Sequence, residues 1–123
     1  MSLSNQQTAV VTGASSGIGA ATARALSKRG LTVHVLARRS GRLAEQTGCI
    51  PHVLDVRDTE TLKSLLNSLN VDILINNAGV GRGYKSLAEA HSSDIDCTIE
   101  TNVQAAVHAV HAVLPSMLKK GSG

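Results

Sequence analysis

The 123-residue sequence has almost no aromatic side chains: it contains one tyrosine and neither phenylalanine nor tryptophan. Its hydrophobic fraction of 42% therefore consists almost entirely of aliphatic residues, which favours a layered α/β core over an aromatic sandwich. The net charge is only +3, and one tyrosine with no phenylalanine or tryptophan does not form an aromatic platform on which bases could stack. We therefore expect no nucleic-acid partner.

Cysteines and long apolar runs are also scarce. Cys49 and Cys97 are far apart and lack metal-ligand spacing, which indicates reduced thiols. No apolar run approaches the ~20 residues of a membrane span, and no signal sequence precedes the first predicted strand. We therefore expect a soluble, cytoplasmic protein with no membrane partner, folded as a single domain over residues 1–123.

The most informative stretch is glycine-rich and spans residues 12–19, after a β-favouring run at 8–11 and before a helical pattern. Gly13 suits a tight turn with positive φ, Gly17 lets a ligand approach the backbone, and Gly19 lets the helix pack closely on the strand. The start of the helix then forms an anion site suited to a pyrophosphate, the alternative being a simple turn. The candidate cofactor-binding residues of this loop are Thr12, Gly13, Ser15, Ser16, Gly17, Ile18 and Gly19.

Helical and strand-like patterns alternate after this loop. The first helix is predicted to end at Gly30 and to bury the face formed by Ile18, Ala21, Ala25 and Leu26. Strands are predicted at 31–37, 50–56 and 71–75, a short helix at 40–46, and a helix that Asp58 caps and that buries Leu62, Leu65, Leu66 and Leu69. The alternation predicts a Rossmann-like, doubly wound parallel sheet of strand order 3-2-1-4 in a three-layer α/β fold.

A long helical stretch is predicted at residues 92–120, in one piece or two, with Pro115 kinking or tightening its end and Gly121 stopping it. We expect this helix to be covered on more than one side. The expected stripe is Ile95, Ile99, Val103, Val107, Val110 and Leu114, widened by Ala106, Ala109 and Val113.

The end of the second strand indicates which cofactor is preferred. An acidic residue there would bind the ribose 2′-hydroxyl of NAD, whereas this chain has Arg38 and Arg39 after Ala37. Guanidinium groups suit a 2′-phosphate, so we expect NADP(H) as cofactor, with NAD less favoured. The alternative is an exposed basic turn.

Two further strand ends carry polar candidates. Asp55, followed by Val56, is expected to close the third strand and to accept a hydrogen bond from the adenine amino group; the alternative is a capping or loop aspartate. The string Asn76, Asn77, Ala78 and Gly79 follows the fourth strand, where amides can satisfy loop backbone and small residues leave room for a ligand; the alternative is a plain turn.

The Thr-Gly-x-x-x-Gly-x-Gly loop and the Asn-Asn-Ala-Gly string together resemble the short-chain dehydrogenase/reductase family, in the right order and over essentially the whole chain. The resemblance implies cofactor contacts at Asp55 and Val56, and a ribose contact from the second asparagine of the string. It also implies that Asn102 is a catalytic-site residue that holds a water in a proton relay. Read without the resemblance, Asn102 is a core polar residue bonded to backbone.

The resemblance covers only the family's cofactor-binding half. The family's active-site serine and Tyr-x-x-x-Lys are missing, and Tyr84-Lys85 does not supply the latter because residue 88 is alanine. His108 and His111 lack the further ligands of a metal site. We therefore expect hydride transfer with a small-molecule carbonyl or alcohol substrate for the family enzyme, but no turnover by these 123 residues alone.

An open strand edge and apolar helix surface would remain on such a half, so we expect either a homo-oligomer or a piece of a longer chain. The alternatives to an enzyme are a non-catalytic dinucleotide-binding module and an oligomerisation module.

Overall fold

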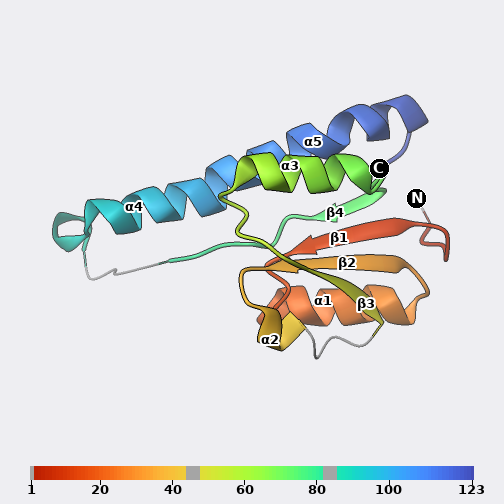
Figure 1. Cartoon of the computed structure of the whole chain (residues 1–123), viewed down its shortest axis with the longest axis horizontal. Helices are drawn as coiled ribbons and strands as arrows, with labels where there is room; N and C mark the ends of the chain where they lie inside the picture. Colours follow the sequence, from red (N-terminus) through yellow and green to blue (C-terminus); the bar gives the residue numbers. More distant parts are fainter. Residues whose placement is uncertain (1, 44–47, 82–85) are drawn as a thin grey trace.

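The fold is described from a computed structural model, which covers residues 2–43, 48–81 and 86–123. Strands and helices alternate through most of it (Figure 1). The elements are β1 (Thr8–Thr12), α1 (Gly17–Lys28), β2 (Thr32–Ala37), α2 (Ser40–Leu43), β3 (Cys49–Val53), α3 (Thr59–Ser68), β4 (Ile73–Ile75), η1 (Leu87–Glu89), α4 (Ser92–Ile99), η2 (Glu100–Gln104) and α5 (Ala105–Lys120).

The strands form one parallel sheet in the order β3-β2-β1-β4, which confirms the predicted Rossmann-like topology. Figure 1 shows α1 on one face of the sheet and α3 with α5 on the other. Successive side chains of the buried strands point alternately to the two faces of the sheet. Val10 and Leu36 join a core with α3 and α5, whereas Val11 and Val35 join a core with α1.

Several strand boundaries differ from the predicted ones. β3 ends at Val53 because it loses its partner where β2 ends at Ala37. The strand was predicted to extend to residue 56, so Asp55 lies after the strand and does not close it. β4 begins at Ile73, where its pairing with Ala9 of β1 begins, rather than at residue 71. For α2 the structure describes Ser40–Leu43, which agrees with the predicted start, and the remainder of the predicted 40–46 helix lies outside the described residues.

The predicted buried face of α1 was wrong except at Leu26, which is partly buried against the core. Ile18 is 79% exposed, whereas Gly19, Ala20 and Ala23 are buried against the sheet. Small residues let the helix axis approach the strands closely, so bulky residues do not mark the contact face here. The predicted stop is confirmed: Gly30 has a φ of 86°, and Leu31 N–H donates to the Leu26 carbonyl at 3.3 Å.

The helical stretch from residue 92 to 120 comprises α4, a π-helical turn η2 and α5 (Figure 1). It continues through Pro115 and stops at Gly121, whose φ is 73°. The expected coverage on more than one side was wrong. Its buried residues are Cys97, Thr101, Ala105, Ala109, Ala112 and Val113, whereas Ile99, Val103, Val107, Val110, Leu114 and Leu118 are all exposed.

We call this exposed set, from Ile99 to Leu118, the outer apolar stripe. Its exposure agrees with the expectation that the long helix leaves apolar surface unpacked. In the part of the chain that the structure describes, no helix has the length and apolar character needed to cross a bilayer.

Candidate functional site

The glycine-rich loop between β1 and α1 has the backbone geometry that the sequence predicts. Gly13 has a φ of 64°, and an added Cβ would lie 2.8 Å from Ala78 Cα. Gly17 has a φ of 58° and open space where a Cβ would be, and a Cβ at Gly19 would lie 2.5 Å from the Gly13 carbonyl oxygen. The loop therefore combines a tight turn, an open backbone face and close packing between helix and strand.

The beginning of α1 opens onto this loop. Ser16 is the N-cap residue in an extended conformation, and its side chain makes no capping hydrogen bond. The first turn of α1 has no acidic side chain. The positive end of the helix dipole is therefore not neutralised by a carboxylate of its own first turn, which is favourable for an anionic ligand.

Asn77 fastens the glycine-rich loop to the end of β4. Its Nδ2 donates to the carbonyl oxygens of Thr12 and Gly13, at 3.1 Å each. The buried Thr12 hydroxyl accepts from the N–H groups of Asn77 and Ala78, at 3.1 and 2.9 Å. Sequence reasoning placed Thr12 in the motif but missed this anchoring role, which needs the fold to bring residues 12 and 77 together.

Asn76 points elsewhere: its Nδ2 donates to the Ala106 carbonyl of α5 at 2.9 Å. The two asparagines therefore tie the end of β4 to different elements, one to the glycine-rich loop and the other to α5. Each amide satisfies neighbouring backbone, as the sequence predicts, and the plain-turn alternative does not account for these contacts.

A pocket of about 280 Å³ opens at the carboxyl ends of the strands. This edge of a parallel sheet is where open α/β folds bind ligands. The predicted residues that line it are Gly13, Ser15, Ser16, Arg38, Asp55, Val56, Asn77, Ala78 and Gly79. Further lining comes from Leu36, Ala37, Leu54, Val80 and Thr101, of which the sequence analysis singled out only Ala37.

The other predicted site residues do not line this pocket. Thr12 is buried and anchors the loop, and Gly17, Ile18 and Gly19 belong to the start of α1. Arg39 is exposed beside Arg38, and Asn76 and Asn102 contact backbone. Thr101 is the least expected lining residue, because it reaches the pocket from the π-helical turn, which the sequence pattern does not reveal.

Asp55 carries a negative charge on the pocket wall. Hydrogen bonds from the Arg57 side chain lower the pKa of this carboxyl, against a smaller opposing effect of burial, and Arg38 adds a minor lowering contribution. Asp55 is not the helix cap: Asp58 caps α3 by accepting from the Thr61 N–H at 3.2 Å. The capping alternative for Asp55 is therefore wrong, whereas the loop alternative agrees with its place after β3 and with its hydrogen bond from the Arg57 N–H at 3.0 Å.

Asn102 lies in η2 and binds one residue of the pocket wall through both ends of its amide. Its Oδ1 accepts from the Val80 N–H at 2.7 Å, and its Nδ2 donates to the Val80 carbonyl at 2.8 Å. The side chain is exposed, so Asn102 is bonded to backbone but is not a core residue. π-Helical turns occur frequently at functional sites, and this one presents Thr101 and Asn102 together.

No group of three or more potential metal ligands occurs within residues 2–43, 48–81 and 86–123. Tyr84 and Lys85 lie outside the described residues.

The structure thus has a Rossmann-like α/β fold with a pocket at the carboxyl edge of its sheet. A family model described as "short chain dehydrogenase" matches residues 7–123. The chain therefore belongs to the short-chain dehydrogenase/reductase family.

Similar proteins have related names. "NADP-dependent 3-hydroxy acid dehydrogenase YdfG" of Escherichia coli (strain K12) is 35% identical, with 93% of this chain and 50% of that protein covered. "Sulfoacetaldehyde reductase 2" of Chromohalobacter salexigens is 32% identical, with 93% and 50% covered. This chain thus spans about half the length of these curated relatives.

Solved structures agree with this assignment. A metagenomic short-chain oxidoreductase in complex with NADP superposes with a TM-score of 0.92 at 31% identity, over 98% of this chain and 60% of that one. The closed form of a serine dehydrogenase complexed with NADP+ gives a TM-score of 0.87 at 33% identity, over 95% of this chain and 51% of that one.

Proposed function

We propose that this chain is the cofactor-binding half of an NADP(H)-dependent oxidoreductase of the short-chain dehydrogenase/reductase type, acting on a small-molecule carbonyl or alcohol. The observation that carries the proposal is the position of Arg38: it follows the end of β2 and lines the same pocket as the glycine-rich loop. Relatives named as NADP-dependent and neighbours solved with NADP support it.

The residues present fit such a cofactor. The glycine-rich loop is a cradle that a Cβ at Gly13 would fill, and the open face at Gly17 leaves the start of α1 accessible to a pyrophosphate. Arg38 would bind the 2′-phosphate, and Arg39 beside it would add positive charge. Asp55 and Val56 would hold the adenine end, and Ala78 and Gly79 leave room for the ribose.

When bound, the nicotinamide supplies the hydride chemistry, and the protein supplies orientation. Asn77 keeps the loop in place through Thr12 and Gly13, and Asn102 keeps Val80 at the pocket wall. We propose that Asn102 also belongs to the proton relay at the catalytic end of the site. These 123 residues alone are proposed to bind cofactor without turnover.

The test is to measure binding of NADPH and NADH to the unmodified chain and to Arg38→Ala. Loss of a charged hydrogen bond to phosphate should weaken NADPH about 10- to 100-fold and leave NADH nearly unchanged. Arg39→Ala should have a smaller effect of the same kind, because Arg39 does not line the pocket. Arg29→Ala, at the opposite end of α1, is the control. Equal weakening of both cofactors by Arg38→Ala would contradict NADP(H) preference.

A second proposal, that the chain associates with itself, is favoured by the outer apolar stripe and by the open edge of β4. Sedimentation should show an oligomer that Val107→Ser together with Leu114→Ser dissociates. A monomer at all concentrations would contradict this proposal without affecting the first.

A further inference from the structure

Arg57 does not line the pocket, but it makes most of its contacts with a residue that does. Its backbone N–H donates to Asp55 Oδ1 at 3.0 Å. Its Nε lies 3.2 and 3.1 Å from the two oxygens of Asp55, and its NH2 lies 2.7 Å from Oδ2. A fork of this kind restricts the rotation of the carboxylate more than a single point contact does.

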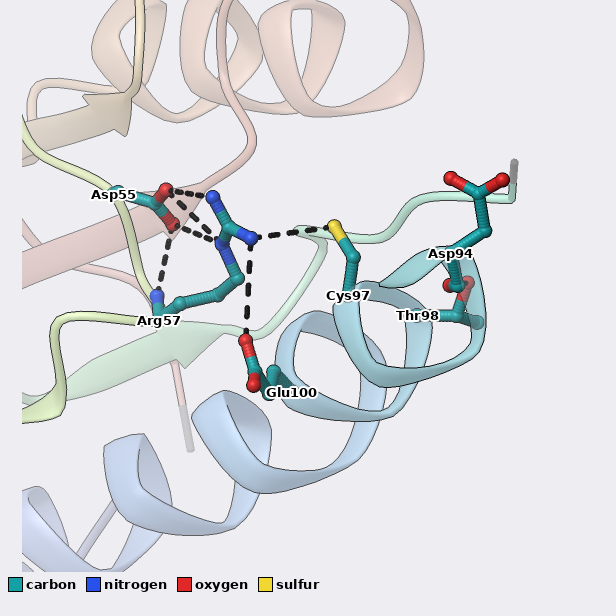
Figure 2. A network of polar contacts seen from close by, with 6 residues as sticks. All are labelled: Asp55, Arg57, Asp94, Cys97, Thr98 and Glu100. Atoms are coloured by element: carbon teal, nitrogen blue, oxygen red, sulfur yellow. Dashed lines mark hydrogen bonds and ion pairs between the residues drawn. The ribbon is translucent and has the colours of Figure 1, made fainter. Parts of the chain in front are cut away.

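The same guanidinium group is held from the other side by the long helical stretch. Its NH1 donates to the sulfur of the buried Cys97 at 3.4 Å and lies 3.9 Å from Glu100 Oε2. Figure 2 shows the Arg57 guanidinium between Asp55 and these two helical residues. Arg57 thus connects the chain after β3 with α4 and η2.

This pairing fixes which hydrogen bonds Asp55 can make. The hydrogen bonds from Arg57 lower the pKa of the Asp55 carboxyl, so the group is ionised at neutral pH and can only accept hydrogen bonds. The Arg57 donors are its backbone N–H, its Nε–H, which is shared between the two oxygens, and its NH2. A carboxylate offers about four acceptor positions, so one position remains for a ligand in the pocket. Such a group attracts an amino donor and repels a carbonyl oxygen in the same place.

We propose that Arg57 is a positioning residue: by holding the Asp55 carboxylate at the pocket wall as a fixed acceptor, it sets the preference of the site for a base with an exocyclic amino group over a base with a carbonyl there. This inference rests on the proposed function, because it concerns the adenine end of the same cofactor. Arg57 acts through Asp55 and does not itself contact the base.

The experiment compares NADPH with its deaminated analogue, in which hypoxanthine replaces adenine, using the fluorescence of the reduced nicotinamide. The unmodified chain should bind NADPH about tenfold more tightly than the analogue, the size expected for a hydrogen bond to a charged group. In Arg57→Gln this ratio should fall to about twofold or less. Arg57→Lys, which keeps the charge but loses the fork, should give an intermediate ratio.

The control is Arg29→Gln, which removes an arginine at the far end of α1 and should leave the ratio unchanged. The ratio is insensitive to partial unfolding, because both ligands report on the same folded molecules. If Arg57→Gln does not fold, the Arg57→Lys ratio decides. A variant that weakens both ligands equally would overturn the inference and show that Arg57 is only structural.

A double-mutant cycle sharpens the result. Asp55→Asn alone should abolish the preference for NADPH over the deaminated analogue. Adding Asp55→Asn to the Arg57→Gln variant should change the affinity ratio little further, because the two residues act as one unit. If the effects of the two substitutions on the affinity ratio were additive in the double variant, the inference would be overturned. Failure of the unmodified chain to bind NADPH at all would instead overturn the proposed function and, with it, this inference.

Discussion

The helices α1 and α5 pack on opposite faces of one sheet through small residues, but their outer faces differ. α1 contacts the sheet through Gly19, Ala20 and Ala23, and α5 buries mainly alanines. Away from the sheet, α1 carries charged residues such as Arg24 and Lys28, whereas the outer apolar stripe, most of which lies on α5, exposes valines and leucines. The exposed residues of α1 are therefore polar or small apart from Ile18, whereas the long helical stretch exposes the outer apolar stripe.

The substitution expected to lower stability most lies in the close contact between α1 and the glycine-rich loop. Gly19→Ala places a Cβ 2.5 Å from the Gly13 carbonyl oxygen, so we expect a loss of about 3 kcal/mol or more in the free energy of unfolding. Gly41→Ala is the matched control, because this helical glycine has open space at the Cβ position. Urea unfolding measures both; similar stabilities would contradict the close packing of α1 on its loop.

The second prediction compares a buried leucine and an exposed leucine in the layer formed by α3 and α5. Leu62 in α3 is 0% exposed and Leu118 in α5 is 72% exposed. Leu62→Ala should lower the unfolding free energy by about 3 kcal/mol, because it leaves a cavity. Leu118→Ala should lower it by less than about 0.5 kcal/mol when both variants are measured at protein concentrations where the chain is monomeric. Thermal unfolding of the two variants tests this, and a large loss in Leu118→Ala would mean that another surface covers the stripe.

A smaller effect concerns the attachment of the glycine-rich loop. Asn77→Ala removes two hydrogen bonds to loop carbonyls and should lower stability by about 2 kcal/mol. Asn76→Ala removes a single bond to α5 and should cost about 1 kcal/mol. Hydrogen exchange should show faster opening of the loop in the first variant only. Equal loop protection in both would contradict the anchoring role of Asn77.

The smallest expected effect is on pH dependence, through two stacked histidines of the sheet. His34 Nδ1 lies 2.9 Å from His52 Nε2, and burial lowers the pKa of both, with a further lowering of His34 by His52. Just below pH 6.5 the unfolded chain therefore binds more protons than the folded chain. The contribution of the two histidines to the free energy of unfolding is full above about pH 6.5 and is lost as the pH falls toward their lowered pKa values in the folded chain.

Unfolding between pH 8 and 5 should reveal this loss, and replacing both residues, as in His34→Gln with His52→Gln, should flatten the slope. His111→Gln, which removes an exposed histidine of α5, is the control. A slope that survives the double replacement would assign the pH dependence to other groups.

The sequence predicted the topology well because strand and helix patterns, glycines and the Asn-Asn-Ala-Gly string are local signals. It failed on most of the contact faces of α1 and α5, because a periodicity rule selects bulky apolar residues whereas the close approach of these helices selects glycine and alanine. The predicted faces did include Leu26, Ala109 and Val113, which lie in or against the core. It also extended β3 past Val53, since only the end of β2 shows where pairing stops.

The site was predicted where it consists of motif residues. The contributions of Thr101, Val80 and Arg57 were missed, because they depend on contacts across long sequence separations and on a π-helical turn. Cys97, for example, is 40 residues from its partner Arg57, and no local pattern links them.

The proposed binding of NADP(H) is tested most directly by a titration of the unmodified chain with NADPH and with NADH at fixed ionic strength, followed by reduced-nicotinamide fluorescence. We predict saturable binding of NADPH that is tighter than that of NADH, because Arg38 lies at the pocket and no carboxylate directly follows β2. Saturable binding of NADH with equal or greater affinity would contradict the assignment of NADP(H), and no binding of either would contradict the assignment of this pocket as a dinucleotide site.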